Sequence, residues 1–246
     1  MDYFYIAIYI FLGIAPSLLW LLYYLKKDLH PEPKKTVLKM YFYGALITIP
    51  VFCLQVWFSK ILYRLEFLDF FYQYPIAVSL IKWFFIIALT EETLKYIGLR
   101  LTILKDGALD EPMDVMLYMV VVASGFAGLE NILYLIPTDT NIILQSVAVT
   151  ALARFFGATL LHTLCSALLG YFLALSFLKT KQHAFLTILG IVLASTLHGL
   201  YDFSIIILDK PFNKIIPTLI IIGLGIFVIH AFDKIRKLKS ICGVKS

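Results

Sequence analysis

The chain has 246 residues, 61% of which are hydrophobic, and its mean hydropathy is +0.89. A soluble domain needs far less apolar surface, so this composition excludes an ordinary soluble protein and indicates one whose solvent is the lipid bilayer. The formal net charge is +5, with the excess Lys and Arg concentrated in a few loops. That pattern favours membrane orientation and contact with anionic lipid headgroups over nucleic-acid binding.

The apolar runs are long and do not alternate with polar residues, which predicts an all-α polytopic membrane protein rather than a barrel. We expect residues 1–246 to form a single transmembrane domain. The seven predicted spans are residues 3–25, 37–58, 76–104, 113–136, 157–178, 184–207 and 214–232. The stretch 140–156 fits either an interfacial helix or an extension of the fifth span, and a crossing there would make eight.

The first apolar run, 3–25, has no basic region before it and no small-residue cleavage site after it. We therefore interpret it as a retained span and not as a signal peptide. Most Lys and Arg residues lie in the loops 26–39, 100–111 and 179–183 and after residue 232. This imbalance predicts an N-terminus outside the cell and a C-terminus in the cytoplasm. Termini on opposite sides require an odd number of crossings, which agrees with seven.

Ionisable side chains interrupt four of these apolar spans. Such a group at the centre of a membrane helix costs roughly 2.5–3.5 kcal/mol on insertion scales, so a set of them indicates function. With a helical rise of about 1.5 Å per residue, all of them fall in the outer half of the bilayer. We therefore predict one water-filled cavity that opens toward the outer leaflet. The residues are Glu91, Glu92, Lys95, Glu130, His162, His198 and Asp202.

The motif TEETLK places Glu91 and Glu92 one turn before Lys95 on the same helix. Lys95 neutralises only one of the two carboxylates, and the other is left desolvated beside a like charge. That setting suits a general acid or base. The alternative is a structural ion pair that joins helices.

The motif GFAGLEN puts Phe126 and Glu130 on one helix face, with Asn131 free to bond a neighbouring helix or a substrate backbone. Its small residues also fit a helix-packing seam, which is the alternative interpretation. The motif HGLYD places His198 and Asp202 one turn apart. Asp202 then fixes the tautomer of His198, or both side chains act as ligands.

His162 is expected to join the site, and Cys165 and Ser166 follow it on the next turn. A nucleophile of the Cys–His or Ser–His type is disfavoured, because that helix offers no third group to orient the pair. Arg154 fits a ligand for a lipid phosphate or a substrate carboxylate, and a snorkelling interfacial charge is the simpler interpretation.

EETLK, GFAGLEN, the segment HTLCSALLGY that begins at His162, and HGLYD follow one another along the chain. In that order they resemble the PrsW family of polytopic membrane proteases, which are related to the CAAX prenyl proteases and other glutamate-dependent membrane proteases. The resemblance covers residues 80–205, the expected catalytic core. It implies that Glu91 and Glu92 carry the chemistry, with Lys95, Glu130, His162 and His198 completing the site. It also implies a multi-pass protein of the bacterial cell membrane. Its substrate would then be a single-pass membrane protein such as an anti-sigma factor, cut on the extracytoplasmic side.

The resulting hypothesis is a peptidase in which Glu91 or Glu92 deprotonates water, while the histidines, helped by Asn131, hold the water or the oxyanion. No cofactor is expected. Zinc bound by His162, His198 and Glu92 is the alternative, although no HExxH helix is present. Competing functions are a proton-coupled transporter and a non-catalytic receptor or assembly subunit.

Overall fold

The computed structural model describes residues 3–28, 30–66, 73–102, 111–136 and 144–238. Across these ranges the regular structure is entirely helical, so the all-α prediction is confirmed. The elements are α1 Tyr3–Leu25, α2 Lys34–Glu66, α4 Pro75–Leu80, η1 Ile81–Leu89, α5 Thr90–Thr102, α6 Pro112–Leu135, α7 Leu144–Phe156, α8 Ala158–Leu178, η2 Thr180–Gln182, α9 His183–Ile207 and α10 Phe212–Arg236.

Six helical segments within the described ranges are long and apolar enough to cross a membrane. They correspond to six of the seven predicted spans, so the prediction of a multi-pass membrane protein is confirmed. The helix α1 has the predicted bounds, and α2 extends beyond them at both ends. The candidates are Tyr3–Leu25, Lys34–Leu65, Pro112–Leu135, Leu144–Leu178, His183–Ile207 and Phe212–Arg236.

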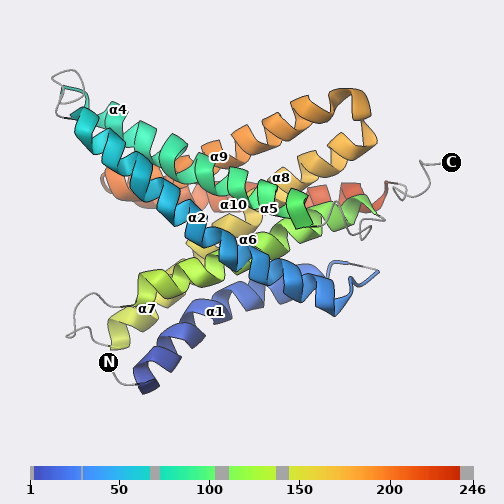
Figure 1. Ribbon diagram of the computed structural model, residues 1–246, viewed down its shortest axis with the longest axis horizontal. Helices are drawn as coiled ribbons and strands as arrows, with labels where there is room; N and C mark the ends of the chain where they lie inside the picture. The colour runs from blue at the N-terminus through green and yellow to red at the C-terminus, as the bar shows by residue number, and fades with distance from the viewer. Residues whose placement is uncertain (1–2, 29, 67–72, 103–110, 137–143, 239–246) are drawn as a thin grey trace.

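The segment predicted as the third span is helical but divided into α4, the π-helix η1 and α5. Figure 1 shows these three elements as one rod that runs alongside α2. Glu91, Glu92 and Lys95 all lie in α5, which makes this segment much less apolar than the others. The count of seven crossings and the orientation of the termini therefore stay predictions. Residues 103 and 104 of the predicted span lie outside the described residues.

The ambiguous stretch before the fifth span forms α7, and only Gly157 separates α7 from α8. The two helices together make the candidate span Leu144–Leu178, which favours an extension of the fifth span over a separate eighth crossing. Gly157 has φ −102° and ψ −101°, a backbone conformation far from the helical one. The regular helix is therefore interrupted at Gly157, five residues before His162.

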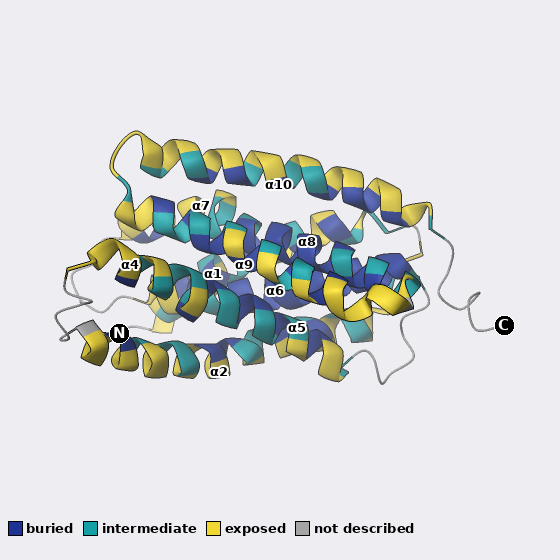
Figure 2. Ribbon diagram, turned by 90° about the horizontal axis from the view of Figure 1, so that it is seen from above, coloured by how far each residue is buried: buried dark blue, intermediate teal, exposed yellow. Residues whose placement is uncertain are grey.

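The core of the bundle is α6, which packs against α8, α2 and α1. Figure 2 shows α6 and α8 as mainly buried ribbons, while α2 and α10 expose one face along their length. Glycine allows the closest helix contact, because a Cβ on Gly125 would lie 1.9 Å from the Tyr41 carbonyl oxygen of α2. The packing role considered for the GFAGLEN motif is therefore confirmed.

Candidate active site

A cavity of about 760 Å³ lies among α2, η1, α5, α6, α7, α8 and α9. Five of the predicted site residues line it: Glu91, Glu130, His162, His198 and Asp202. The other three, Glu92, Lys95 and Asn131, lie behind its wall and are almost fully buried. The cavity thus gathers ionisable groups from four helices that are far apart in sequence.

Glu91 is the second residue of α5, whose first residue, Thr90, directly follows the π-helix η1. π-Helical turns add a residue to a helix and are frequent at functional sites. Here the turn precedes a carboxylate that is only 4% exposed. Gln55 of α2 donates a hydrogen bond from Nε2 to Glu91 Oε1 at 2.9 Å. Glu91 Oε2 is buried and has no hydrogen-bond partner among the described residues.

Three nitrogen atoms surround that unpaired oxygen at longer range. Glu91 Oε2 lies 3.7 Å from Lys95 Nζ, 3.8 Å from His162 Nδ1 and 3.9 Å from His198 Nε2. These gaps are too long for direct hydrogen bonds. They leave room for a small group that contacts the carboxylate and both imidazoles together.

Glu92 turns away from the cavity because neighbouring helix positions point about 100° apart. Its Oε1 accepts hydrogen bonds from Lys95 Nζ at 2.8 Å and from His198 Nδ1 at 3.0 Å. Ser166 Oγ donates to its Oε2 at 3.3 Å. Lys95 also lies 4.3 Å from the ring centroid of Phe126, a cation–π contact. Glu92 therefore holds a histidine and a lysine in place and does not face the cavity.

The two imidazoles are each oriented by a carboxylate. Glu92 Oε1 lies 3.0 Å from His198 Nδ1, a distance at which Nδ1–H donates to the carboxylate. In the same way, Glu130 Oε2 lies 2.8 Å from His162 Nε2, and Lys95 Nζ lies 3.0 Å from Nδ1 on the other side of that ring. The two rings meet edge to face with centroids 4.9 Å apart. His162 Nδ1 and His198 Nε2 both lie near Glu91 Oε2, at 3.8 Å and 3.9 Å.

Arg154 of α7 is paired within the protein, so the interpretation as a snorkelling charge is wrong, while its role as a ligand for a lipid or substrate stays a prediction. Its Nη2 donates to Glu130 Oε2 at 2.7 Å and its Nε donates to Asn131 Oδ1 at 2.6 Å. The guanidinium also stacks 4.1 Å from the ring centroid of Tyr134. Arg154 thus fixes the carboxylate that orients His162.

Asn131 does not reach the cavity, contrary to the expectation that it helps to hold water or an oxyanion. Its Nδ2 donates to the Gly13 carbonyl oxygen at 3.1 Å and to Thr159 Oγ1 at 3.0 Å. With Arg154 on its oxygen, its side-chain hydrogen-bonding groups are occupied. Asn131 therefore braces α6 against α1, α7 and α8.

Asp202 lies at the cavity wall, with its Oδ2 3.4 Å from His198 Nε2. Asp202 and Glu91 therefore both present acceptor oxygens to this nitrogen. Cys165 is fully buried and Ser166 donates to Glu92, and neither residue lines the cavity. The arrangement gives no support to a cysteine or serine nucleophile.

Sequence reasoning missed Gln55, whose amide is bonded to the carboxylate that faces the cavity. The available signal was a single amide side chain near the end of the otherwise apolar predicted span 37–58.

Glu91, His162 and His198 form the group of side chains suited to a metal ion, with one donor atom from each within 4.8 Å of the others. Glu91 replaces Glu92 in the predicted ligand set, because Glu92 is occupied by Lys95 and His198. The unpaired oxygen of Glu91 and the two carboxylate-oriented imidazoles fit a divalent cation of the zinc type.

An all-helical membrane protein with a buried carboxylate, two oriented imidazoles and a cavity belongs to the class of membrane-embedded hydrolases. A family model described as "PrsW family intramembrane metalloprotease" matches residues 32–231. The match extends beyond the expected core of residues 80–205 on both sides. The chain belongs to this PrsW family of intramembrane proteases.

Proteins named Protease PrsW from three bacteria are similar to the chain over most of their length. The Oceanobacillus iheyensis protein is 32% identical over 191 residues, which are 78% of this chain and 80% of that protein. The Bacillus subtilis protein is 30% identical over 210 residues, or 85% and 87% of the two chains. The Geobacillus kaustophilus protein is 28% identical over 199 residues, or 80% of each. No solved structure matches the chain.

Proposed function

We propose that this protein hydrolyses a peptide bond of a membrane-anchored protein near the extracytoplasmic side, with water activated at Glu91. The observation that carries the proposal is the unpaired Glu91 Oε2, which is buried at the cavity wall and lies 3.8 Å from His162 Nδ1 and 3.9 Å from His198 Nε2. Of the two glutamates considered, Glu91 is favoured because Glu92 does not line the cavity.

Amide hydrolysis at this position needs few steps. A water beside Glu91 Oε2 gives up a proton to the carboxylate as its oxygen bonds to the scissile carbonyl carbon. Glu91 then passes that proton to the leaving nitrogen as the C–N bond breaks, which yields a carboxylate and an amine. Glu92 and Glu130 hold the two imidazoles in place beside the reacting water.

The family description implies a divalent cation, and Glu91, His162 and His198 would hold it. When bound, such an ion would polarise the scissile carbonyl and lower the pKa of a bound water. Lys95 and Arg154 carry compensating positive charge on the protein side of the site. These pairs hold Glu92 and Glu130 in fixed positions within the bundle.

The cavity wall supports a substrate delivered through the lipid. Exposed apolar side chains of α6, α7 and α9 line the cavity, among them Leu133, Tyr134, Val149 and Ile206. A hydrophobic anchor next to the scissile bond would contact this rim while the extended segment enters the cavity. We infer a single-pass, anti-sigma-factor-like substrate, as the resemblance to this family implies.

The test compares one candidate sequence in two forms, with and without its membrane anchor. Proteoliposomes containing the protein are incubated with each form, and products are mapped by mass spectrometry. We expect cleavage of the anchored form at one site next to the anchor. Equal cleavage of the anchor-free peptide would contradict delivery through the lipid. Coupled ion flux without products would point to a proton-coupled transporter.

A further inference from the structure

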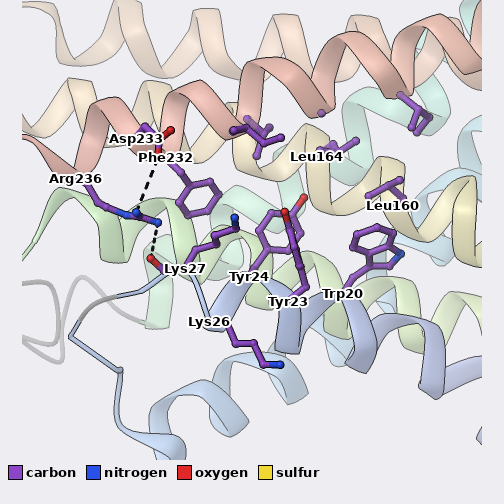
Figure 3. A pocket seen from close by; sticks show the side chains of 14 residues that line it. Trp20, Tyr23, Tyr24, Lys26, Lys27, Leu160, Leu164, Phe232, Asp233 and Arg236 are labelled. Carbon is purple, nitrogen blue, oxygen red and sulfur yellow. Dashed lines mark hydrogen bonds and ion pairs between the residues drawn. The ribbon is translucent and has the colours of Figure 1, made fainter.

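A second cavity of about 400 Å³ lies between α1, α8 and α10, and it shares no lining residue with the catalytic cavity. Figure 3 shows its side chains: Lys27 and Arg236 lie at one end, and Trp20 and Leu160 lie at the other. The cavity follows the seam where α10 lies on the rest of the bundle (Figure 2). We call it the α1–α10 groove.

The groove is basic at the end where α1 and α10 both terminate. Lys26, Lys27 and Arg236 line this end, and Asp233 is the one acidic side chain among the lining residues. Arg236 donates from Nη2 to the Lys27 carbonyl oxygen at 2.7 Å, which ties the two helix ends together. Arg236 Nη1 lies 3.8 Å from Asp233, so this acid offsets part of the positive charge. A net positive charge remains at the mouth.

The walls beyond this end are apolar and largely buried. Tyr24 and Phe232 stack with centroids 5.8 Å apart, and Leu164 and Val228 continue the surface. Trp20 is fixed at the far end, because its ring stacks on Phe155 and its Nε1 donates to the Phe155 carbonyl oxygen at 2.9 Å. The groove is therefore a preformed apolar channel with a cationic mouth.

The length of the groove indicates what kind of molecule it can hold. From Ile221 to Arg236, α10 rises roughly 22 Å, which exceeds the ~15 Å of hydrocarbon in one leaflet. The volume of the groove, about 400 Å³, is spread along that length. The groove is thus long enough to hold one acyl chain of a lipid.

We propose that the α1–α10 groove binds one anionic phospholipid. The phosphate lies between Lys27 and Arg236, and one acyl chain extends along Tyr24 and Val228 toward Trp20. Basic pockets between transmembrane helices are known sites for anionic headgroups, and here the apolar channel runs from such a pocket to mid-membrane depth. The lipid fills the seam between the first and last helices. The proposal does not depend on the catalytic one.

Trp20 provides the probe. In a Trp57→Phe/Trp83→Phe background it is the single tryptophan, since the chain has three. The protein in neutral detergent is titrated with phosphatidylglycerol or phosphatidylcholine that carries brominated acyl chains, and quenching of Trp20 is recorded. We expect saturable quenching by the anionic lipid at much lower concentration than by the zwitterionic one.

Two pairs of variants test the mouth and the channel separately. Removing two mouth charges with Lys27→Gln/Arg236→Gln should weaken anionic-lipid binding roughly 30-fold. The control Lys234→Gln/Lys237→Gln removes two charges from the same end of α10 outside the groove and should leave binding unchanged.

The channel pair uses two glycines of α10 at which an added Cβ meets nothing within 4 Å. Gly225 lines the groove and Gly223 does not. Gly225→Leu should abolish quenching by occupying the channel, and Gly223→Leu should not.

Quenching that is equal for both lipids, or that survives both Lys27→Gln/Arg236→Gln and Gly225→Leu, would overturn the proposal. Native mass spectrometry of the same samples identifies the occupant directly. An adduct with the mass of one anionic phospholipid, lost in Gly225→Leu, supports it. A second copy of the chain or a bound peptide that Gly225→Leu displaces would assign the groove to a protein partner and overturn it.

Discussion

Replacing Lys95 is the substitution whose effect on stability follows most directly from the structure. Its ammonium is fully buried and lies 2.8 Å from Glu92 Oε1, 3.0 Å from His162 Nδ1 and 3.7 Å from Glu91 Oε2. At an effective dielectric of 20, the attraction at 2.8 Å is about 6 kcal/mol before desolvation is counted. Removing one partner of such a buried pair typically costs about 3–5 kcal/mol, because the other charge is left uncompensated.

We therefore expect Lys95→Met to lower the free energy of unfolding by about 3–5 kcal/mol. Adding Glu92→Gln to Lys95→Met should restore part of that loss, since the uncompensated charge is then gone. The coupling in this double-mutant cycle should reach about 1–3 kcal/mol. The assay is reversible unfolding in mixed micelles with increasing dodecyl sulfate, followed by circular dichroism.

The control is Lys60→Met, which removes an exposed lysine of α2 and should change stability by less than about 0.5 kcal/mol. Strict additivity of Lys95→Met and Glu92→Gln would refute the reasoning. So would a Lys95→Met variant as stable as the control.

Four further predictions follow from individual contacts. Gln55→Leu removes the hydrogen bond to the Glu91 carboxylate and should lower the single-turnover cleavage rate about tenfold or more. The free energy of unfolding should change by only about 1 kcal/mol. Asn131→Ala should lower stability by about 1–3 kcal/mol and should lower cleavage less than Gln55→Leu does, because Asn131 reaches the cavity only through its contact with Arg154. Gly125→Leu should prevent assembly, seen as loss of monodisperse protein, because its Cβ would lie 1.9 Å from a carbonyl oxygen. Removing metal with a chelator should abolish cleavage, and adding zinc should restore it. Elemental analysis of His198→Ala should find less than one bound metal ion per chain.

The sequence predicted contacts well where spacing along one helix determines them. The one-turn separations of Glu91 and Lys95, and of His198 and Asp202, appear as distances of 3.7 Å and 3.4 Å. Long apolar runs likewise predicted most helix bounds, because a span must pair its own backbone groups in lipid.

Contacts between helices could not be predicted, because they depend on helix rotation and crossing. Arg154 pairs with Glu130 across α7 and α6, and Gln55 reaches Glu91 from α2. Which of the adjacent glutamates faces the cavity also depends on the rotation of α5. The third predicted span is interrupted by η1, a change of helix type that hydropathy alone does not encode.

The most direct test of water activation at Glu91 is the single-turnover cleavage rate of a membrane-anchored substrate by Glu91→Gln in proteoliposomes. Asp209→Asn, which removes an exposed carboxylate just after α9, is the matched control. We predict a rate about 10²–10⁴ times lower for Glu91→Gln and an unchanged rate for the control. A folded Glu91→Gln protein that cleaves as fast as the control would contradict the account.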